Sequence, residues 1–324
     1  MPPLKFHPIF KRIRWGGRRL ETLLGKPLPE GDDYAESWEI SCHPHGESVV
    51  DGGPYDGRTL KELIVESPQN ILGQHASLGK FPLLVKFLDA HDRLSVQVHP
   101  NDTQASQYRT GESGKTEAWV ILAAEPDSQI YAGLKSDVTA EQFQEAIQTD
   151  NVESCLHSVT AFPGDCFFIP AGTVHAIGEG ILLAEIQQSS DLTFRLYDWG
   201  RVDASGQPRE LHIQEAMECI DFSRGPVNPV IPHQEHIDET IHEQLVECEH
   251  FIIRRHTSRT PFTVPTDNRF HIFIVLDGQC EIADHHTPTT APVGQSLLIP
   301  ASCPDVKVTP SQEKPLVLLD AFLP

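Results

Sequence analysis

Residues 94–100, Leu-Ser-Val-Gln-Val-His-Pro, alternate strictly between apolar and polar side chains. In an extended chain this period of two places the leucine and the valines on one face and the polar groups on the other. The polar face consists of Ser95, Gln97 and His99. Such a strand suits the mouth of a small β-barrel that holds a ligand or a metal ion. The same pattern also occurs in an ordinary edge strand whose polar face is solvated.

Two further segments favour the barrel. In residues 114–122 a carboxylate, Glu117, stands just ahead of a strand-like apolar run. Residues 164–175 contain an apolar strand, a Pro-Ala-Gly turn and then His175 at the start of the next strand. Two nitrogen and two oxygen ligands form a set that zinc accepts. That set would be Gln97, His99, Glu117 and His175.

Four motifs, SVQVHPND, GKTEAW, PAGTVHAI and EIQQSSDLTFRLYDWGR, together resemble the type I mannose-6-phosphate isomerases, most closely the short bacterial form. The resemblance extends from WGGRRL to LHIQEAMECID, about two-thirds of the chain. It implies a cupin fold, one zinc ion per chain and interconversion of mannose 6-phosphate and fructose 6-phosphate. It also implies that the four ligands above bind the metal and that Arg195 is the catalytic arginine.

Aldose–ketose isomerisation moves a proton between C1 and C2 through an enediolate, whose negative charge a Lewis-acid metal can stabilise. Arg195 lies on the polar face of the alternating segment 191–197, where its guanidinium could hold oxyanion charge. The general base stays open between Lys115, Glu185 and a hydroxide on the metal. Lys115 shares the strand face of Glu117 if the strand has begun there, and it could instead contact the phosphate or a sugar hydroxyl.

The substrate is expected to meet two more side chains. Lys86 interrupts the apolar run 81–88, so its ammonium must reach either a polar cavity or bulk water. We expect Lys86, together with Ser95, to bind substrate. Two other functions remain possible: isomerisation of another aldose or aldose phosphate, and sugar binding by a non-catalytic cupin.

The overall composition excludes several classes of protein. A formal net charge of −21 argues against nucleic-acid binding, because duplex affinity depends on basic side chains that neutralise phosphate. A local basic pocket could still bind a small anion. The chain has no apolar run of about 18 residues and no signal-peptide core, so we expect no membrane span. Seven cysteines without CxxC spacing are typical of reduced thiols, which indicates a cytoplasmic protein.

Abundant proline and sparse helical periodicity predict a mostly β fold with a small helical insertion. Capping signals and apolar spacing predict short helices near residues 59–67, 139–149 and 211–221, the last with Leu211 among its buried positions. Two histidine-containing segments have the composition of turns, and we interpret both as turns and not as metal sites. They are residues 42–46 and His285-His286.

An internal repeat predicts two cupin (jelly-roll) β-barrels. Residues 294–305 align with residues 164–175 without a gap, and Asp305 replaces His175. His271 is the only imidazole near the repeat, and its sequence neighbours offer no second ligand. We therefore expect an N-terminal catalytic barrel over residues 1–235, and a C-terminal barrel without metal over residues 236–324.

Overall fold

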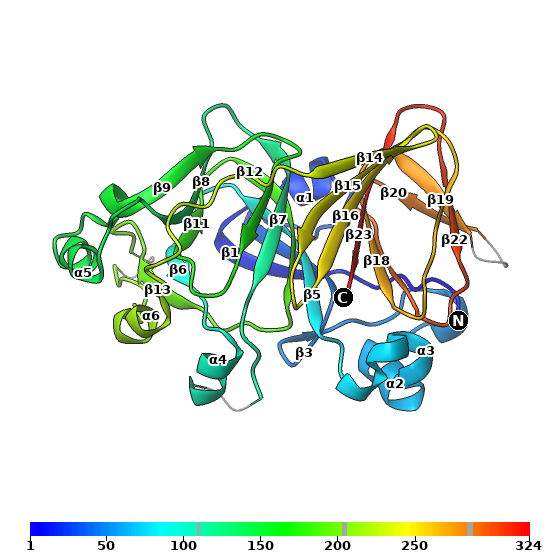
Figure 1. Ribbon diagram of the computed structural model, residues 1–324, viewed down its shortest axis with the longest axis horizontal. Helices are drawn as coiled ribbons and strands as arrows, with labels where there is room; N and C mark the ends of the chain where they lie inside the picture. Colours follow the sequence, from blue (N-terminus) through cyan, green and yellow to red (C-terminus); the bar gives the residue numbers. More distant parts are fainter. Residues whose placement is uncertain (109–110, 203–205, 284–287) are drawn as a thin grey trace.

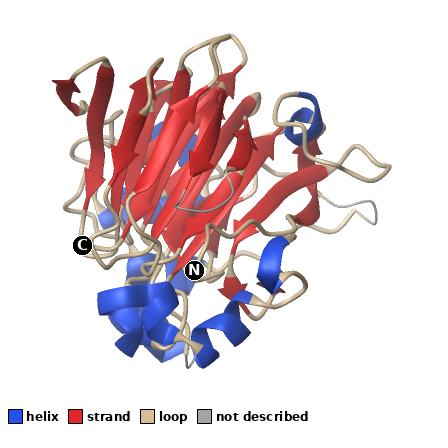
Figure 2. Ribbon diagram, turned by 90° about the vertical axis from the view of Figure 1, so that its right-hand side faces the viewer, coloured by secondary structure: helices blue, strands red, loops and turns tan. Residues whose placement is uncertain are grey.

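The computed structural model describes residues 1–108, 111–202, 206–283 and 288–324. The fold is mostly β, as predicted, and the strands form two halves that lie side by side (Figure 1). Most of the helices lie at one end of the strand layers (Figure 2). No helix among the described residues is long and apolar enough to cross a membrane.

The first half contains two antiparallel sheets. The six-stranded sheet has the order β1 (Ile9–Gly17), β2 (Tyr34–Ile40), β5 (Leu83–Ala90), β12 (Ile181–Gln188), β7 (Glu117–Ala124) and β10 (Cys166–Ile169). The five-stranded sheet has the order β13 (Phe194–Tyr197), β6 (Val96–Val98), β11 (His175–Ile177), β8 (Gln129–Leu134) and β9 (Leu156–Thr160). A short hairpin, β3 (Cys42–His43) and β4 (Gly46–Glu47), confirms the turn expected at residues 42–46.

The second half repeats this plan. Its six-stranded sheet has the order β14 (His233–Ile237), β15 (Thr240–Glu247), β16 (Ile252–Ser258), β23 (Leu316–Phe322), β18 (His271–Asp277) and β21 (Ser296–Ile299). The smaller sheet has the order β17 (Phe262–Val264), β22 (Val306–Pro310), β19 (Gln279–Ala283) and β20 (Thr289–Pro292). The pair His285-His286 lies outside the described residues. The division at residue 235 stays a prediction; that residue lies within β14.

The repeat in the sequence corresponds to equivalent strands. β10 and β21 begin two residues after Gly164 and Gly294 respectively, and each forms one end of a six-stranded sheet. The two positions that close the repeat differ, because His175 is buried whereas Asp305 is exposed. Asp305 therefore does not reproduce the placement of His175.

One hydrophobic core joins the two halves. It runs from Leu4 to Leu323 and includes Phe81 and Phe270, whose ring centroids are 4.9 Å apart. Leu4 also pairs with Leu298 through two backbone hydrogen bonds of 2.8 and 2.9 Å. The halves consequently share apolar burial and do not pack as separate globules.

All three predicted helices form, and α2 and α5 have the expected threonine caps. α2 (Leu60–Glu66) begins after Thr59, whose hydroxyl accepts a hydrogen bond from the Glu62 backbone. α5 (Ala140–Gln148) begins after Thr139 with the same reciprocal arrangement. α6 (Ile213–Cys219) is shorter than predicted, and the expected burial of Leu211 is wrong because this residue precedes the helix and is 43% exposed.

Three further α-helices were not predicted: α1 (Arg19–Thr22), α3 (Pro68–Leu72) and α4 (Asp102–Tyr108). Short 3₁₀ turns cover Gly53–Tyr55, Gly73–Leu78 and Val152–Cys155. The sequence Pro100-Asn101-Asp102 has the composition of a turn, but in the structure α4 begins at Asp102. Asn101 Oδ1 accepts from the Gln104 amide at 2.9 Å, and Gln104 Oε1 accepts from the Asn101 amide at 3.0 Å.

The surroundings of His271 also differ from the prediction. Its Nδ1 lies 2.7 Å from Asp320 Oδ1 on the neighbouring strand β23. On the other side of that carboxylate, His256 Nε2 lies 3.9 Å from Asp320 Oδ2. The expectation of a solitary imidazole is wrong because its partners come from adjacent strands and not from adjacent positions in the sequence.

Candidate active site

One wall of the site is a row of side chains on the five-stranded sheet. Arg195 on β13 stands opposite Gln97 on β6, and Gln97 stands opposite His175 on β11. Residues in register share a face of the sheet, so three strands present these side chains together. β6 is shorter than the predicted strand, and Ser95 and His99 flank it.

The opposing wall is a row on the six-stranded sheet. Glu185 on β12 stands opposite Lys86 on β5 and Trp119 on β7. Glu117 lies two residues before Trp119 and therefore projects from the same face. Two facing sheets thus deliver the predicted residues into the interior of one barrel-like space.

Three buried side chains converge at the floor of this space. The ligand atoms of His99, Glu117 and His175 all lie within 4.8 Å of one another. Glu117 Oε2 is 3.7 Å from His99 Nε2, and Glu117 Oε1 is 3.4 Å from His175 Nε2. Gln97 borders the group, with its amide nitrogen 3.2 Å from His175 Nε2.

The imidazoles are oriented as metal ligands are. His99 Nδ1 lies 3.0 Å from the Leu192 carbonyl, and His175 Nδ1 lies 2.9 Å from the Thr173 carbonyl. A carbonyl can only accept, so each Nδ1 carries the proton and each Nε2 keeps its lone pair. Both lone-pair atoms belong to the convergent group. The donor set and its orientation therefore fit a divalent ion such as zinc.

Burial sets the protonation of these ligands. It lowers the pKa of His175 to about 3, with the charge of Lys115 acting in the same direction. Burial and Lys115 also hold the pKa of His99 well below its ordinary value. Burial raises the pKa of Glu117 to about 7, although Lys115 opposes it. The histidines are therefore neutral near pH 7, whereas Glu117 titrates there.

Lys115 lies at the centre of the site. Its Nζ is 2.5 Å from Glu117 Oε2, 3.0 Å from His99 Nε2 and 3.8 Å from Glu185 Oε1. We expected Lys115 to share the strand face of Glu117 if the strand had already begun at Lys115. In the structure β7 begins at Glu117, and Lys115 precedes it. The side chain nevertheless enters the same space from the loop.

Lys86 points into the polar cavity and does not reach bulk water, since it is only 5% exposed. Its Nζ lies 3.4 Å from Glu185 Oε1 and 3.7 Å from Glu36 Oε2. Burial acts to lower the pKa of Lys86, but the two carboxylates outweigh it and raise the value. Burial likewise acts to raise the pKa of Glu185, but Lys86 and Lys115 lower it. At the buried end of the site the positive charges of the lysines are therefore balanced by carboxylates.

A pocket of about 320 Å³ opens above the buried group. This volume falls at the lower end of the range for small-molecule sites. Predicted site residues that line it are Lys86, Ser95, Gln97, Lys115, Glu185 and Arg195. The sequence prediction did not single out Trp15, Glu36, Trp119 and Arg209, which also line it. Arg195 is held by a 3.3 Å bond from Nε to the Ser95 hydroxyl and a 2.7 Å bond from Nη1 to the Glu210 carbonyl.

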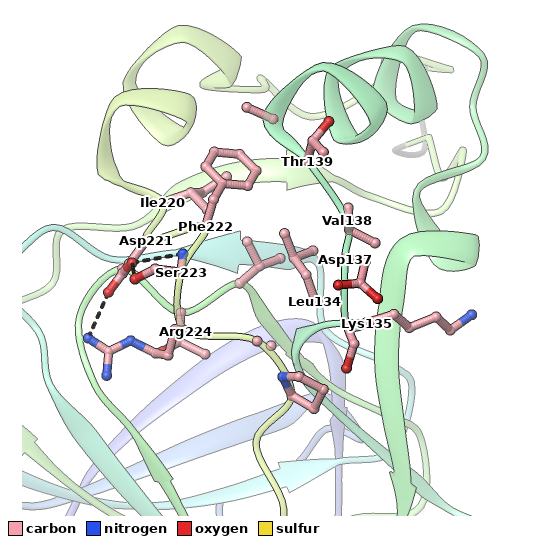
Figure 3. Close-up of a pocket in the computed structure, with 18 residues that line it drawn as sticks. Leu134, Lys135, Asp137, Val138, Thr139, Ile220, Asp221, Phe222, Ser223 and Arg224 are labelled. Atoms are coloured by element: carbon pink, nitrogen blue, oxygen red, sulfur yellow. Dashed lines mark hydrogen bonds and ion pairs between the residues drawn. The ribbon is translucent and has the colours of Figure 1, made fainter.

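A larger pocket, of about 540 Å³, lies elsewhere (Figure 3). It is lined by residues 133–140, 172–174 and 220–226, and Arg224 pairs there with Asp221 at 3.3 Å. None of the predicted site residues lines it, so its size alone does not mark it as the active site.

Comparisons with known proteins agree with this geometry. The family model of the type I phosphomannose isomerase catalytic domain matches residues 4–170, about half of the chain. The mannose-6-phosphate isomerase ManA of Bacillus subtilis (strain 168) is 37% identical over 306 residues, which cover 94% of this chain and 95% of that protein. The probable mannose-6-phosphate isomerase GmuF of the same organism is 35% identical, with 92% and 93% covered.

Solved structures extend the comparison. The crystal structure of the mannose 6-phosphate isomerase from Bacillus subtilis superposes with a TM-score of 0.90 and 30% identity, over 99% of both chains. A putative mannosephosphate isomerase from Archaeoglobus fulgidus shares the fold, with a TM-score of 0.79 and 22% identity over 100% of this chain and 99% of that one. The chain is an isomerase with a cupin-type fold. Within that class it belongs to the type I phosphomannose isomerase family.

Proposed function

We propose that this protein interconverts mannose 6-phosphate and fructose 6-phosphate. The observation that carries the proposal is the convergence of His99, Glu117 and His175 beneath a pocket lined by Lys115 and Glu185. An aldose–ketose isomerase needs a buried site that stabilises an enediolate and a group that moves one proton. Relatives that match almost the whole chain carry the name of this activity.

We further propose that one zinc ion is held by His99 Nε2, His175 Nε2, the Glu117 carboxylate and Gln97. The side-chain amide of Gln97 would then turn so that its oxygen replaces the nitrogen that faces His175. Two imidazoles and two oxygens are ligands that zinc accepts, and zinc can expand to five-coordinate to take a substrate oxygen. When bound, a divalent ion would polarise the sugar carbonyl and offset the negative charge that develops on the neighbouring oxygens.

Glu185 is the general base in this proposal. Its pKa is lowered by Lys86 and Lys115 despite burial, so the carboxylate is ionised near pH 7. It lines the pocket, where it can take the proton from C2 and return it to C1. Lys115, an ammonium between Glu117 and Glu185, instead donates hydrogen bonds to the sugar oxygens.

Arg195 stabilises negative charge on the substrate. It lies on the strand directly across from Gln97 and lines the same pocket. The Ser95 hydroxyl accepts from Arg195 Nε and can donate its own proton to a sugar oxygen. Lys86 orients Glu185 and faces the same pocket.

We place the reaction in the cytoplasm, with a small sugar phosphate as partner and no nucleic acid. The described residues contain no disulfide bond between any of the seven cysteines, which suits a reducing compartment. The net charge of −21 opposes binding to polyphosphate chains.

The test combines metal analysis, turnover and isotope exchange. The purified protein should contain zinc and convert mannose 6-phosphate to fructose 6-phosphate in a coupled assay. In deuterated water Glu185→Gln should keep its metal but lose both turnover and exchange of the substrate C2 proton. As a control, Glu243→Gln removes a carboxylate paired with Arg255 in the second half. This variant should keep both the turnover and the exchange of the substrate C2 proton. Turnover of another aldose phosphate in preference to mannose 6-phosphate would contradict the substrate, and full exchange in Glu185→Gln would contradict the base.

A further inference from the structure

The rim of the substrate pocket carries a second arginine that the proposed chemistry does not use. Arg209 lines the same pocket as Arg195. Its side chain is 26% exposed, so a ligand can reach it although most of it is buried. No periodic pattern in the sequence singles it out.

Arg209 is held rigidly by a buried carboxylate. Its Nε lies 2.9 Å from Asp198 Oδ2, and its Nη2 lies 2.9 Å from Asp198 Oδ1. Asp198 is 6% exposed, and Arg201 fixes it from another side with a 2.6 Å bond to Oδ1. A two-pronged pair of this kind fixes the plane of the guanidinium. Within the described part of the chain both hydrogen bonds of Arg209 leave from Nε and Nη2, so Nη1 is available to a ligand.

The charge around Arg209 favours an anion. Arg201 divides its contacts between Asp198 and Asp92, and the lysines deeper in the pocket contact glutamates. Arg195 makes no ion pair with any described residue. Burial lowers the pKa of Arg195, and the charge of Arg209 is the next largest cause. Two guanidiniums therefore repel each other at the rim of an otherwise charge-matched pocket, and an anion between them would relieve that repulsion.

We propose that Arg209 binds the phosphate group of the sugar and thereby selects phosphorylated over unphosphorylated substrate. The inference rests on the proposed function. In that function C1 and C2 lie over Glu117 and Glu185 at the buried end. The phosphate on C6 is at the opposite end of the sugar chain and extends towards the rim. Asp198 is a positioning residue, because it acts only through Arg209.

The experiment compares two substrates in Arg209→Gln. A hydrogen bond to a charged group contributes enough binding that its loss should raise KM for mannose 6-phosphate about 10–100-fold. The kcat should change little, and turnover of unphosphorylated mannose, however slow, should not change. Competitive inhibition by inorganic phosphate should weaken by a similar factor. Asp198→Asn should raise the same KM by a smaller factor and leave turnover of mannose unchanged.

The matched control is Arg224→Gln, because Arg224 is also partly exposed and also pairs with an aspartate, yet lies at the other pocket. Equal KM values for Arg209→Gln and Arg224→Gln would overturn the inference while leaving the isomerase activity in place. If the wild-type protein does not turn over mannose 6-phosphate, calorimetry can still measure how tightly that sugar phosphate binds. This measurement tests the role of Arg209 independently of the isomerase activity. Weaker binding in Arg209→Gln would then support the phosphate site although the proposed function had failed. If Arg209→Gln does not fold, Arg209→Lys replaces it, since lysine keeps the positive charge but lacks the planar guanidinium. An unchanged KM for mannose 6-phosphate in Arg209→Lys would overturn phosphate binding by the guanidinium.

Discussion

The raised pKa of Glu117 makes a quantitative prediction about metal binding. Zinc requires the ionised carboxylate, so protons compete with the metal wherever Glu117 titrates. With a pKa of about 7, Glu117 is about nine-tenths ionised at pH 8 and about one-tenth ionised at pH 6, so the apparent association constant should fall about tenfold between them. The affinity falls with falling pH because the raised pKa of Glu117 lets protons compete with zinc at a higher pH than an ordinary carboxyl group would.

The histidines should not add to this dependence. Burial holds the pKa of His175 at about 3 and that of His99 well below its ordinary value, so both are already neutral at pH 6. The slope of log affinity against pH should therefore approach about one at the acid end of this range. Two imidazoles with ordinary pKa values would steepen it towards about three below pH 6.

The assay is competition for zinc with a fluorescent chelator, corrected for protonation of the chelator itself. Glu117→Gln should bind zinc more weakly and lose the slope between pH 6 and pH 8. A flat profile in the wild-type protein would refute the reasoning, because Glu117 would already be ionised at pH 6. A slope near two or above would refute the assignment of neutral histidines.

Three further predictions concern metal content and catalysis. His99→Ala and His175→Ala should each lose both bound metal and activity, and full occupancy by elemental analysis in either would remove that residue from the ligand set. Arg195→Ala should keep its metal and fold but lose about 10²-fold or more in kcat, with partial rescue by Arg195→Lys; a change in KM alone would make it a binding residue. The protein should contain one tightly bound metal per chain and Asp305→Ala should leave that number unchanged, whereas a second equivalent lost on that substitution would contradict a single site.

Short-range sequence patterns predicted which side chains share a strand face and where two helices begin. The alternation around Gln97 places that residue on the polar face because side-chain direction in a strand depends on position alone. The capping threonine at position 59 and the capping box at Thr139 predicted two helices because capping bonds are local. The same bonds form at Asn101, but the preceding proline and the following aspartate favoured a turn, and the helix α4 was missed.

Long-range pairings were not accessible from such patterns. Nothing in the sequence near Arg209 indicates that Asp198 accepts two of its hydrogen bonds. His271 meets Asp320 because β18 and β23 are neighbours in the sheet, although the two residues are 49 positions apart. Sheet order decides such contacts, and local periodicity carries no information about it.

The pairing of Leu4 with Leu298 has a consequence for biosynthesis. The backbone partner of Leu4, Leu298, is translated about 290 residues later. At ordinary elongation rates the nascent N-terminal segment waits roughly 15–60 seconds before its neighbour exists. During that interval the shared core between the halves is incomplete, and its apolar residues are exposed to chaperones or to other chains. A slower ribosome would lengthen this exposure without altering the finished enzyme, so the yield of native protein should depend on translation speed more than its final stability does.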